Sequence, residues 1–253
     1  MNGERPPSRR SGLFGPAVAA LVAFAVLIGL GIWQIERKAW KENLIDTLGR
    51  KLAAAPVDLP PAAEWARLDR TDWEFRRVRF AGEFRNDNDQ EALVYTSGST
   101  LRTDAGGPGY WVFAPARTRD GLVPVNRGFV PLDRKDVATR IAGQLSGSID
   151  IVGALRWPDS RAWFTPSDDP AKNLWFARDP AAMAAEKRWG PVPPFYVEQE
   201  APVPPGGLPA PGRLTPNLPN NHLQYAITWF GLAAVLAGVF AAFARGRYRE
   251  VGG

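Results

Sequence analysis

The sequence predicts a membrane protein with two transmembrane α-helices flanking an extracytoplasmic, mainly antiparallel β (α+β) domain, either a small barrel or a sandwich. Three observations support this fold class. An apolar stretch lies near each end of the 253-residue chain, and about 20 residues of helix suffice to cross a bilayer. Between them, short runs rich in Val, Phe, Tyr and Trp are separated by Gly, Pro, Asn and Asp, as in antiparallel sheets. Arginines gather after the second stretch, which indicates its orientation.

The amino-acid composition excludes several classes of function. The chain is 45% hydrophobic but has only two long apolar runs, so it is not a polytopic transporter. Its net charge is +5, yet the basic residues are scattered or lie next to the apolar runs, and we expect no nucleic acid partner. Cysteine is absent and His222 is the only histidine, which excludes disulfides, thiol catalysis and cysteine-based metal sites.

The first membrane helix is expected at residues 13–35, after a polar, cytoplasmic segment at 1–12. Its apolar core is longer than that of a usual signal peptide and lacks a small-x-small cleavage site. We therefore expect an uncleaved helix with Trp33 and Gln34 at its far interface. Helical spacing continues after it, so residues 36–55 are either a continuation of this helix or a surface helix packed on the domain.

The domain between the spans covers residues 36–221. Short apolar runs, two of them joined by a turn with an Asp-Gly pair, predict six strands, at 75–84, 92–96, 109–117, 122–131, 149–157 and 194–200. Residues 173–179 are a candidate for one more strand. Short helices are expected within 132–146 and from Pro180 onward, with Asp179 as the N-cap.

The Pro- and Gly-rich residues 201–219 predict an extended tether that leads into a second membrane helix at 222–244. Three arginines follow this helix within 245–253, whereas only Arg213 shortly precedes it. The positive-inside rule places the C-terminus, and after two spans also the N-terminus, in the cytoplasm. We therefore expect a two-pass protein of the bacterial inner membrane, in contact with lipid, with a periplasmic domain.

His222 is the main candidate for a binding residue. Imidazole is a common ligand of metals and of haem iron, and His222 lies in the first turn of the second span. Tyr225 and Trp229 share its helix face at spacings of three and seven residues. Trp33 and Gln34 of the first span are expected at the same depth. The alternative is an interfacial histidine beside aromatic residues, which are common at membrane surfaces.

No catalytic constellation is found. The sequence contains no GxSxG, P-loop, HExxH or dinucleotide-binding motif, and we expect no enzyme activity. The carboxylates of Asp168 and Asp169 are better explained by a solvated turn. Arg127, beside a glycine at a strand end, is a candidate for receiving an acidic group such as a propionate. A structural salt bridge or a surface position is the more common role of such an arginine.

Four segments occur in a distinctive order: GIWQIERKAWKENLI after the first span, FRRVRFAGEF, VNRGFVP at 125–131 and NNHLQYAITWFGLA at the second span. Through them, over nearly the whole chain, the sequence resembles the Surfeit locus protein 1 family, assembly factors of haem–copper terminal oxidases. The resemblance implies two spans with a loop domain outside and a role in building the haem a centre. For a bacterial member it implies binding of haem a by the histidine of the second span, here His222.

On this resemblance we expect an assembly factor for cytochrome c oxidase that binds haem a transiently and aids its insertion into oxidase subunit I. Haem a synthase is a further candidate partner. His222 is expected to ligate the iron, and the expected pocket lining consists of Tyr225, Trp229, Trp33, Gln34 and Arg127. The alternative is a membrane scaffold that binds no cofactor and stabilises an early assembly intermediate.

Overall fold

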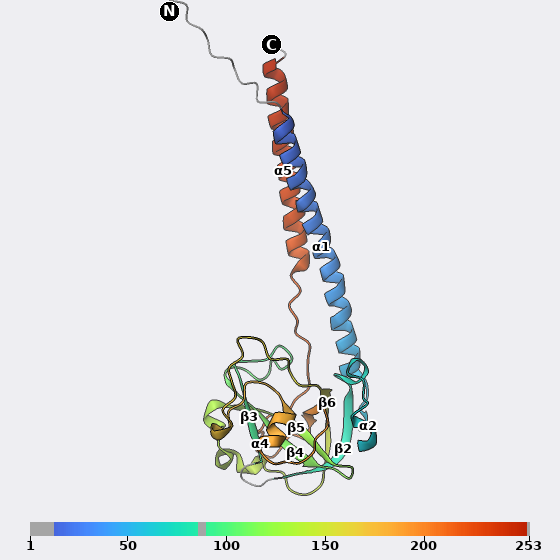
Figure 1. Ribbon diagram of the computed structural model, residues 1–253, viewed down its shortest axis with the longest axis vertical. Helices are drawn as coiled ribbons and strands as arrows, with labels where there is room; N and C mark the ends of the chain where they lie inside the picture. The colour runs from blue at the N-terminus through green and yellow to red at the C-terminus, as the bar shows by residue number, and fades with distance from the viewer. Residues whose placement is uncertain (1–12, 86–89, 252–253) are drawn as a thin grey trace, which may run out of the picture. The chain divides into compact units, whose positions relative to one another are not determined.

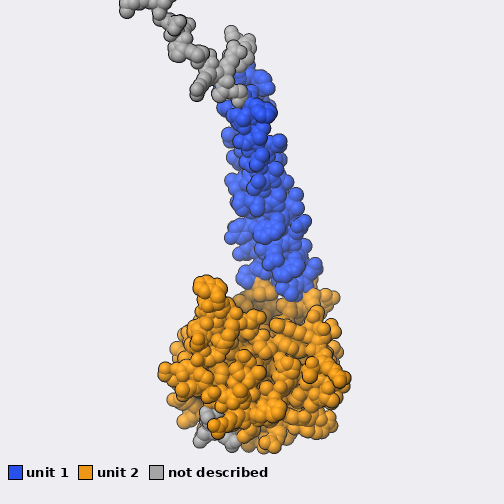
Figure 2. Space-filling model, viewed as in Figure 1, with its two compact units in different colours: residues 1–45, 219–253 blue, residues 46–218 orange. Residues whose placement is uncertain are grey.

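The structure is a computed structural model that describes residues 13–85 and 90–251. The chain divides into two compact units (Figure 2). Residues 1–45 and 219–253 form the helical unit, and residues 46–218 form the barrel unit. Each unit has its own secondary structure, helical in the first and mainly strands in the second.

The described residues of the helical unit form two long helices. Helix α1 spans Phe14–Ala53, its last turns belonging to the barrel unit, and helix α5 spans His222–Val251. Both are long and apolar enough to cross a membrane, as the sequence predicts. Because α1 is unbroken to Ala53, the helical pattern after the first span is a continuation of that span and not a separate surface helix.

The two helices pack in opposite directions (Figure 1). Their less exposed positions include a series with alternating spacings of three and four, as in a coiled-coil seam, at 17, 20, 24, 27, 31 and 34 in α1 and 222, 226, 229, 233, 236 and 240 in α5. Gly31, Ala226 and Ala233 are buried. Small residues allow this close approach, since a Cβ on Gly31 would lie 2.5 Å from the Phe230 ring.

Seven strands form one sheet in the barrel unit, in the order β1-β2-β6-β7-β5-β4-β3. They are β1 (Val57–Asp58), β2 (Arg77–Phe84), β3 (Ala92–Thr96), β4 (Gly109–Arg117), β5 (Leu122–Pro131), β6 (Ile149–Arg156) and β7 (Tyr196–Ala201). The end of β2 also pairs with β4, Glu83 with Arg117 and Phe84 with Ala116. This pairing closes β2, β6, β7, β5 and β4 into a five-stranded barrel, so the barrel prediction is confirmed over the sandwich.

Most strand pairs are antiparallel, as predicted, but β1–β2 and β5–β7 are parallel. Residues 173–179 do not form a regular strand. Trp175 makes a single bridge to Val94, after a left-handed turn at Asn173 and before a bend at 176–177. The short helices are α2 (Ala62–Trp65), α3 (Arg70–Trp73), η1 (Leu132–Arg134), η2 (Val137–Gly143), η3 (Pro170–Lys172) and α4 (Pro180–Glu186). Asp179 caps α4 as predicted.

The barrel interior is apolar and receives side chains from all five barrel strands. These are Val78 and Phe84, Ala114 and Ala116, Val123 and Val125, Ile151 and Leu155, and Val197. Most are small or β-branched, which suits the narrow interior of a five-stranded barrel. On the opposite face of the pleated strands, Trp111, Phe113 and Tyr196 pack under a cover that includes Met183 of α4 and Trp189. Both faces of this part of the sheet are therefore buried.

The segment that follows β7 is attached to the barrel along part of its length, rather than being a free tether. Phe129 and Ala210 exchange two backbone hydrogen bonds of 3.0 and 2.8 Å, and the amide of Thr215 donates to the carbonyl of Leu101 at 2.8 Å. Leu214 is buried. The prolines of this segment lack an amide hydrogen, but the amides of Ala210, Gly212 and Thr215 bond to the barrel and fix the course of the segment.

Gly128 allows this attachment. Its φ is +122°, and a Cβ at this position would overlap the carbonyl of Ala210. We predict that Gly128→Ala lowers the free energy of unfolding by about 2 kcal/mol or more, from backbone strain and the displaced segment. Chemical unfolding of the detergent-solubilised full chain, followed by tryptophan fluorescence, measures the loss. Gly98→Ala is the control, because Gly98 has φ +144° but open space around it; equal losses in both variants would contradict the role of the Ala210 contact.

Candidate functional site

His222 is the first residue of α5, and its side chain makes a polar contact with the other helix. Its Nδ1 lies 2.7 Å from Oε1 of Gln34 on α1. Gln34 is only 9% exposed, whereas its neighbours Trp33 and Ile35 are about half exposed. The sequence predicts His222 and Gln34 at the same depth, and the structure brings them together. The hydrogen bond between them was not predicted from the sequence.

Contacts on both sides of this pair hold it in register. Toward the middle of the helices, the ring of Phe230 lies against Gly31. Toward the end of the helix pair, the Lys41 ammonium donates a hydrogen bond to the carbonyl of Pro219, just before α5 begins. The imidazole of His222 is thus placed by the helix packing and not only by its own rotamer.

The aromatic candidates lie on the surface of the helix pair. Tyr225 is 56% and Trp33 52% exposed, while Trp229 is half-buried in the seam. Among the residues that the structure describes, none of these three rings stacks on another aromatic ring. The rings of Tyr225 and Trp33 are therefore open to an apolar ligand or to lipid.

Arg127 lies in the barrel unit and is 2% exposed. Its guanidinium donates to Oε1 of Glu91 at 3.0 Å, to Oε1 of Gln144 at 3.2 Å and to the carbonyl of Gly143. It also lies over the Phe84 ring, 4.6 Å from its centroid. This geometry favours the structural salt bridge that the sequence offers as the alternative, and it gives no support to Arg127 as the lining of a cofactor pocket.

Glu91 is the centre of this buried polar cluster, which sequence reasoning missed. Arg140 donates to both of its carboxylate oxygens, and Gln144 donates to Oε1 at 3.0 Å. Burial alone raises the pKa of Glu91, but the hydrogen bonds and charge of Arg140, together with Gln144 and Arg127, outweigh burial and hold this pKa below the usual range of a glutamate. The only sequence feature that could have indicated this cluster is the position of Glu91, an acidic residue directly before the apolar strand β3.

Asp168 and Asp169 serve a turn, as the sequence predicts. Asp168 accepts a hydrogen bond from the amide of Phe176 at 2.7 Å and forms an ion pair with Arg161. Asp169 accepts from the amide of Lys172 and pairs with its ammonium at 2.8 Å. Both carboxylates have structural partners, which leaves no acid–base pair at this position.

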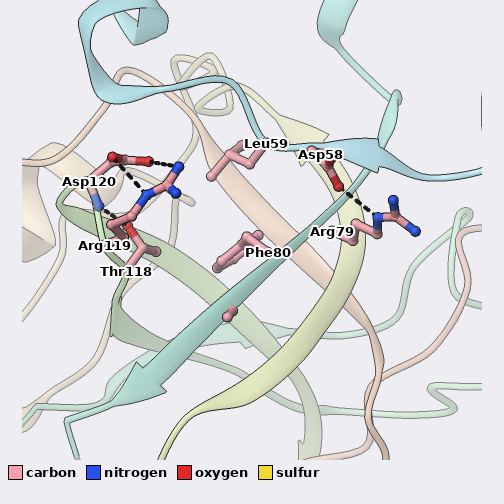
Figure 3. Close-up of a pocket in the computed structure, with 8 residues that line it drawn as sticks. Asp58, Leu59, Arg79, Phe80, Thr118, Arg119 and Asp120 are labelled. Atoms are coloured by element: carbon pink, nitrogen blue, oxygen red, sulfur yellow. Dashed lines mark hydrogen bonds and ion pairs between the residues drawn. The ribbon is translucent and has the colours of Figure 1, made fainter.

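The barrel unit also has a pocket of about 390 Å³ beside β1, β2 and the β4–β5 turn (Figure 3). Two ion pairs stand at its opposite sides, Asp58–Arg79 at 2.7 Å and Arg119–Asp120 at 3.4 Å, with Phe80 between them. Because its charged side chains pair with each other, the pocket offers no uncompensated charge to an ionic ligand. Within 13–85 and 90–251, no three His, Cys, Asp or Glu residues gather as a metal site.

The fold and the site define a membrane protein with two candidate spans, a five-stranded barrel between them in sequence, and one histidine held at the end of an apolar helix pair. A model of the SURF1 family matches residues 21–234, and the chain belongs to this family. That membership is consistent with a role in cytochrome c oxidase assembly.

Individual relatives match over most of their length. Surfeit locus protein 1 of Rattus norvegicus is 36% identical, over 83% of this chain and 69% of the relative. The protein of the same name from Homo sapiens is 34% identical, over 86% and 74%. A SURF1-like protein of Monosiga brevicollis is 36% identical, over 90% and 86%. The similarity therefore extends over both units.

The buried carboxylate predicts a pH-dependent contribution to stability. Since the pKa of Glu91 is lowered in the folded state, its ion pairs stabilise the fold above the unfolded pKa, and this contribution is lost as the pH falls through the folded value. We predict that Glu91→Gln lowers the free energy of unfolding at neutral pH by about 3–5 kcal/mol, because two buried arginines lose their counter-charge. The difference from the original chain should shrink as the pH falls below the ordinary pKa of a glutamate and toward the lowered value in the fold.

Chemical unfolding of the detergent-solubilised chain at a series of pH values measures this difference. The exposed Glu64 provides the control, since Glu64→Gln should change stability little at any pH. A loss below about 1 kcal/mol in Glu91→Gln, or a loss that does not vary with pH, contradicts the assigned role of Glu91.

Proposed function

We propose that this protein is a haem a carrier in the assembly of cytochrome c oxidase. His222 is the proposed iron ligand, and the protein holds haem a beside the membrane before it enters oxidase subunit I. One histidine ligand suits a carrier, because a cofactor held through a single protein bond is more readily released than one held through two. The proposal assigns the chain no catalytic step.

The hydrogen bond between His222 and Gln34 is the observation that carries the proposal. It engages Nδ1, while Nε2 has no hydrogen-bond partner among the described residues. Histidines that bind metals usually have one ring nitrogen on a protein partner and the other on the metal. Cysteine is absent from the chain, so the donor set fits a haem bound through imidazole.

The exposed aromatic side chains support an amphiphilic cargo. Tyr225, Trp229 and Trp33 are the proposed contacts for the apolar ring and tail of haem a, whose iron supplies redox chemistry only once it is in the oxidase. They lie at the end of the spans where α5 begins and where an interface between lipid and water is expected. A ligand with an apolar body and acidic groups is suited to such a boundary.

The arginines at the C-terminal end of α5 support a cytoplasmic location for both chain ends. We therefore propose the bacterial inner membrane as the location, with the barrel unit in the periplasm. Oxidase subunit I is the proposed acceptor and haem a synthase the proposed donor of the cofactor. Lipid is the expected surrounding of the helix pair.

A scaffold that binds no cofactor is the alternative, and one observation favours it. Trp163 and Phe164 are 96% and 71% exposed at the tip of a turn, which is closed by hydrogen bonds between Ala162 and Thr165. Large apolar side chains held in water at such a tip are typical of protein contacts. On this alternative, the barrel unit binds an oxidase intermediate through this turn and His222 is interfacial.

The visible spectrum of the detergent-purified protein, co-expressed with haem a biosynthesis, tests the carrier proposal. We expect a haem a band in the original chain and its loss in His222→Ala, because the chain has no second histidine. Circular dichroism of both proteins checks that the helices and the barrel are intact. A band that survives in His222→Ala contradicts His222 as the ligand.

The scaffold alternative predicts a different pattern. Oxidase assembly should then tolerate His222→Ala but fail when Trp163 and Phe164 are both replaced by Ser, and the folded protein should carry no haem a band. Disruption of the 125–131 strand does not separate the two proposals, because Arg127 and Gly128 are needed for the fold itself. Assembled oxidase in the membranes is measured by its haem a content and oxygen uptake.

A further inference from the structure

The hydrogen bond at His222 favours one of the two ring nitrogens as the carrier of the proton. The partner atom of Nδ1 is the amide oxygen Oε1 of Gln34, and an amide oxygen can only accept a hydrogen bond. Nδ1 must therefore be the donor. A neutral imidazole with its proton on Nδ1 has its lone pair on Nε2, which is the form that ligates a metal through Nε2.

The surroundings of Gln34 make this hydrogen bond hard to replace. The side chain is 9% exposed and follows seam positions occupied by Ala17, Ala20, Phe24, Leu27 and Gly31. Among these apolar and small residues it is the first polar group along the seam. A buried amide without a partner is costly in such surroundings, so His222 and Gln34 each restrict the orientation of the other.

Contacts before and after the His222–Gln34 pair fix the position of α1 along α5. Gly31 lies three residues before Gln34 and receives the Phe230 ring, while Lys41 lies seven residues after Gln34 and binds the carbonyl of Pro219. These contacts fix the register of α1 against α5 at the depth of the pair. The position of the imidazole is therefore set before any ligand binds.

We propose that Gln34 is the positioning residue for His222: it holds the proton on Nδ1 and so presents Nε2 as the iron-ligating nitrogen. This inference rests on the proposed binding of haem a and deepens it. Gln34 is then not part of the pocket lining. It acts on the cofactor only through the imidazole, as the partners of metal-binding histidines do.

A merely structural role is the competing explanation, since a hydrogen bond between membrane helices also stabilises their association. The two roles differ in what they change. A structural role affects helix packing, whereas a positioning role also affects the tautomer of the imidazole and the strength of the iron bond. The single histidine of the chain makes the tautomer directly measurable.

The first experiment is nitrogen NMR of the full chain in detergent or nanodiscs at alkaline pH, without haem and with ring-¹⁵N-labelled histidine. All imidazole signal then comes from His222. We expect Nδ1 to be protonated and Nε2 to be bare. In Gln34→Leu we expect a shift toward the Nε2-protonated form that free imidazoles prefer, while Gln34→Glu, which keeps an acceptor oxygen, should retain the original tautomer.

The second experiment is a titration of the same proteins with ferric haem a, followed by absorbance. Loss of the partner of a ligating histidine weakens metal binding by about 10- to 100-fold, so the dissociation constant should rise by that factor in Gln34→Leu and recover in Gln34→Glu. Gln224→Leu is the matched control, because Gln224 is an exposed glutamine in the first turn of α5, the turn that also contains His222. Thermal unfolding of each variant without haem reports any change in helix packing.

The outcomes separate this inference from the function on which it rests. An Nε2-protonated imidazole in the original chain, or an unchanged tautomer and haem affinity in Gln34→Leu, overturns the positioning role even if haem a binds. The positioning role is also overturned if Gln34→Leu lowers the haem a affinity only because the protein unfolds, and if Gln34→Glu does not restore that affinity. Absence of haem a binding in the original chain overturns the carrier proposal, and the NMR result still decides whether Gln34 sets the tautomer.

Discussion

A polar side chain that is removed from water must find its partner inside the protein, and both units of this chain depend on that constraint. In the helical unit the buried amide of Gln34 has one such partner, the imidazole of His222. In the barrel unit the carboxylate of Glu91 receives hydrogen bonds from Arg127, Arg140 and Gln144. Each pairing joins elements that are distant in sequence and so holds its unit together.

The two polar clusters differ in what remains after pairing. The groups around Glu91 bond to one another and to backbone carbonyls, which is typical of a structural network. The pair in the helical unit leaves one nitrogen of His222 unengaged, at the end of a helix and beside exposed aromatic side chains. A buried network without spare bonding capacity stabilises a fold, whereas a positioned group with a free lone pair can also bind a ligand.

The VNRGFVP segment shows how a distinctive motif can serve the fold. Val125 fills the barrel interior, while Asn126 bonds to Glu198 on the parallel neighbour β7 and to the amide of Gly128. Arg127 turns to Glu91, and Gly128 leaves room for the segment after β7. Strand alternation sends successive side chains to opposite faces, so adjacent residues of one motif support different parts of the structure. Sequence reasoning recognised the motif and offered both a binding role and a structural role for Arg127, and its contacts favour the structural role.

The sequence by itself determined the two apolar helices, six of the seven strands, the Asp179 cap and the candidacy of His222, because each of these follows from local patterns of apolar spacing, turn residues and composition. The two-residue β1 was too short to leave such a pattern. Only the tertiary structure decided the closure of the barrel through β2 and β4, the ion pairs of Glu91 and the hydrogen bond of Gln34. These depend on which distant segments meet, and a side chain such as that of Gln34 has the same local signature whether it faces lipid, water or His222.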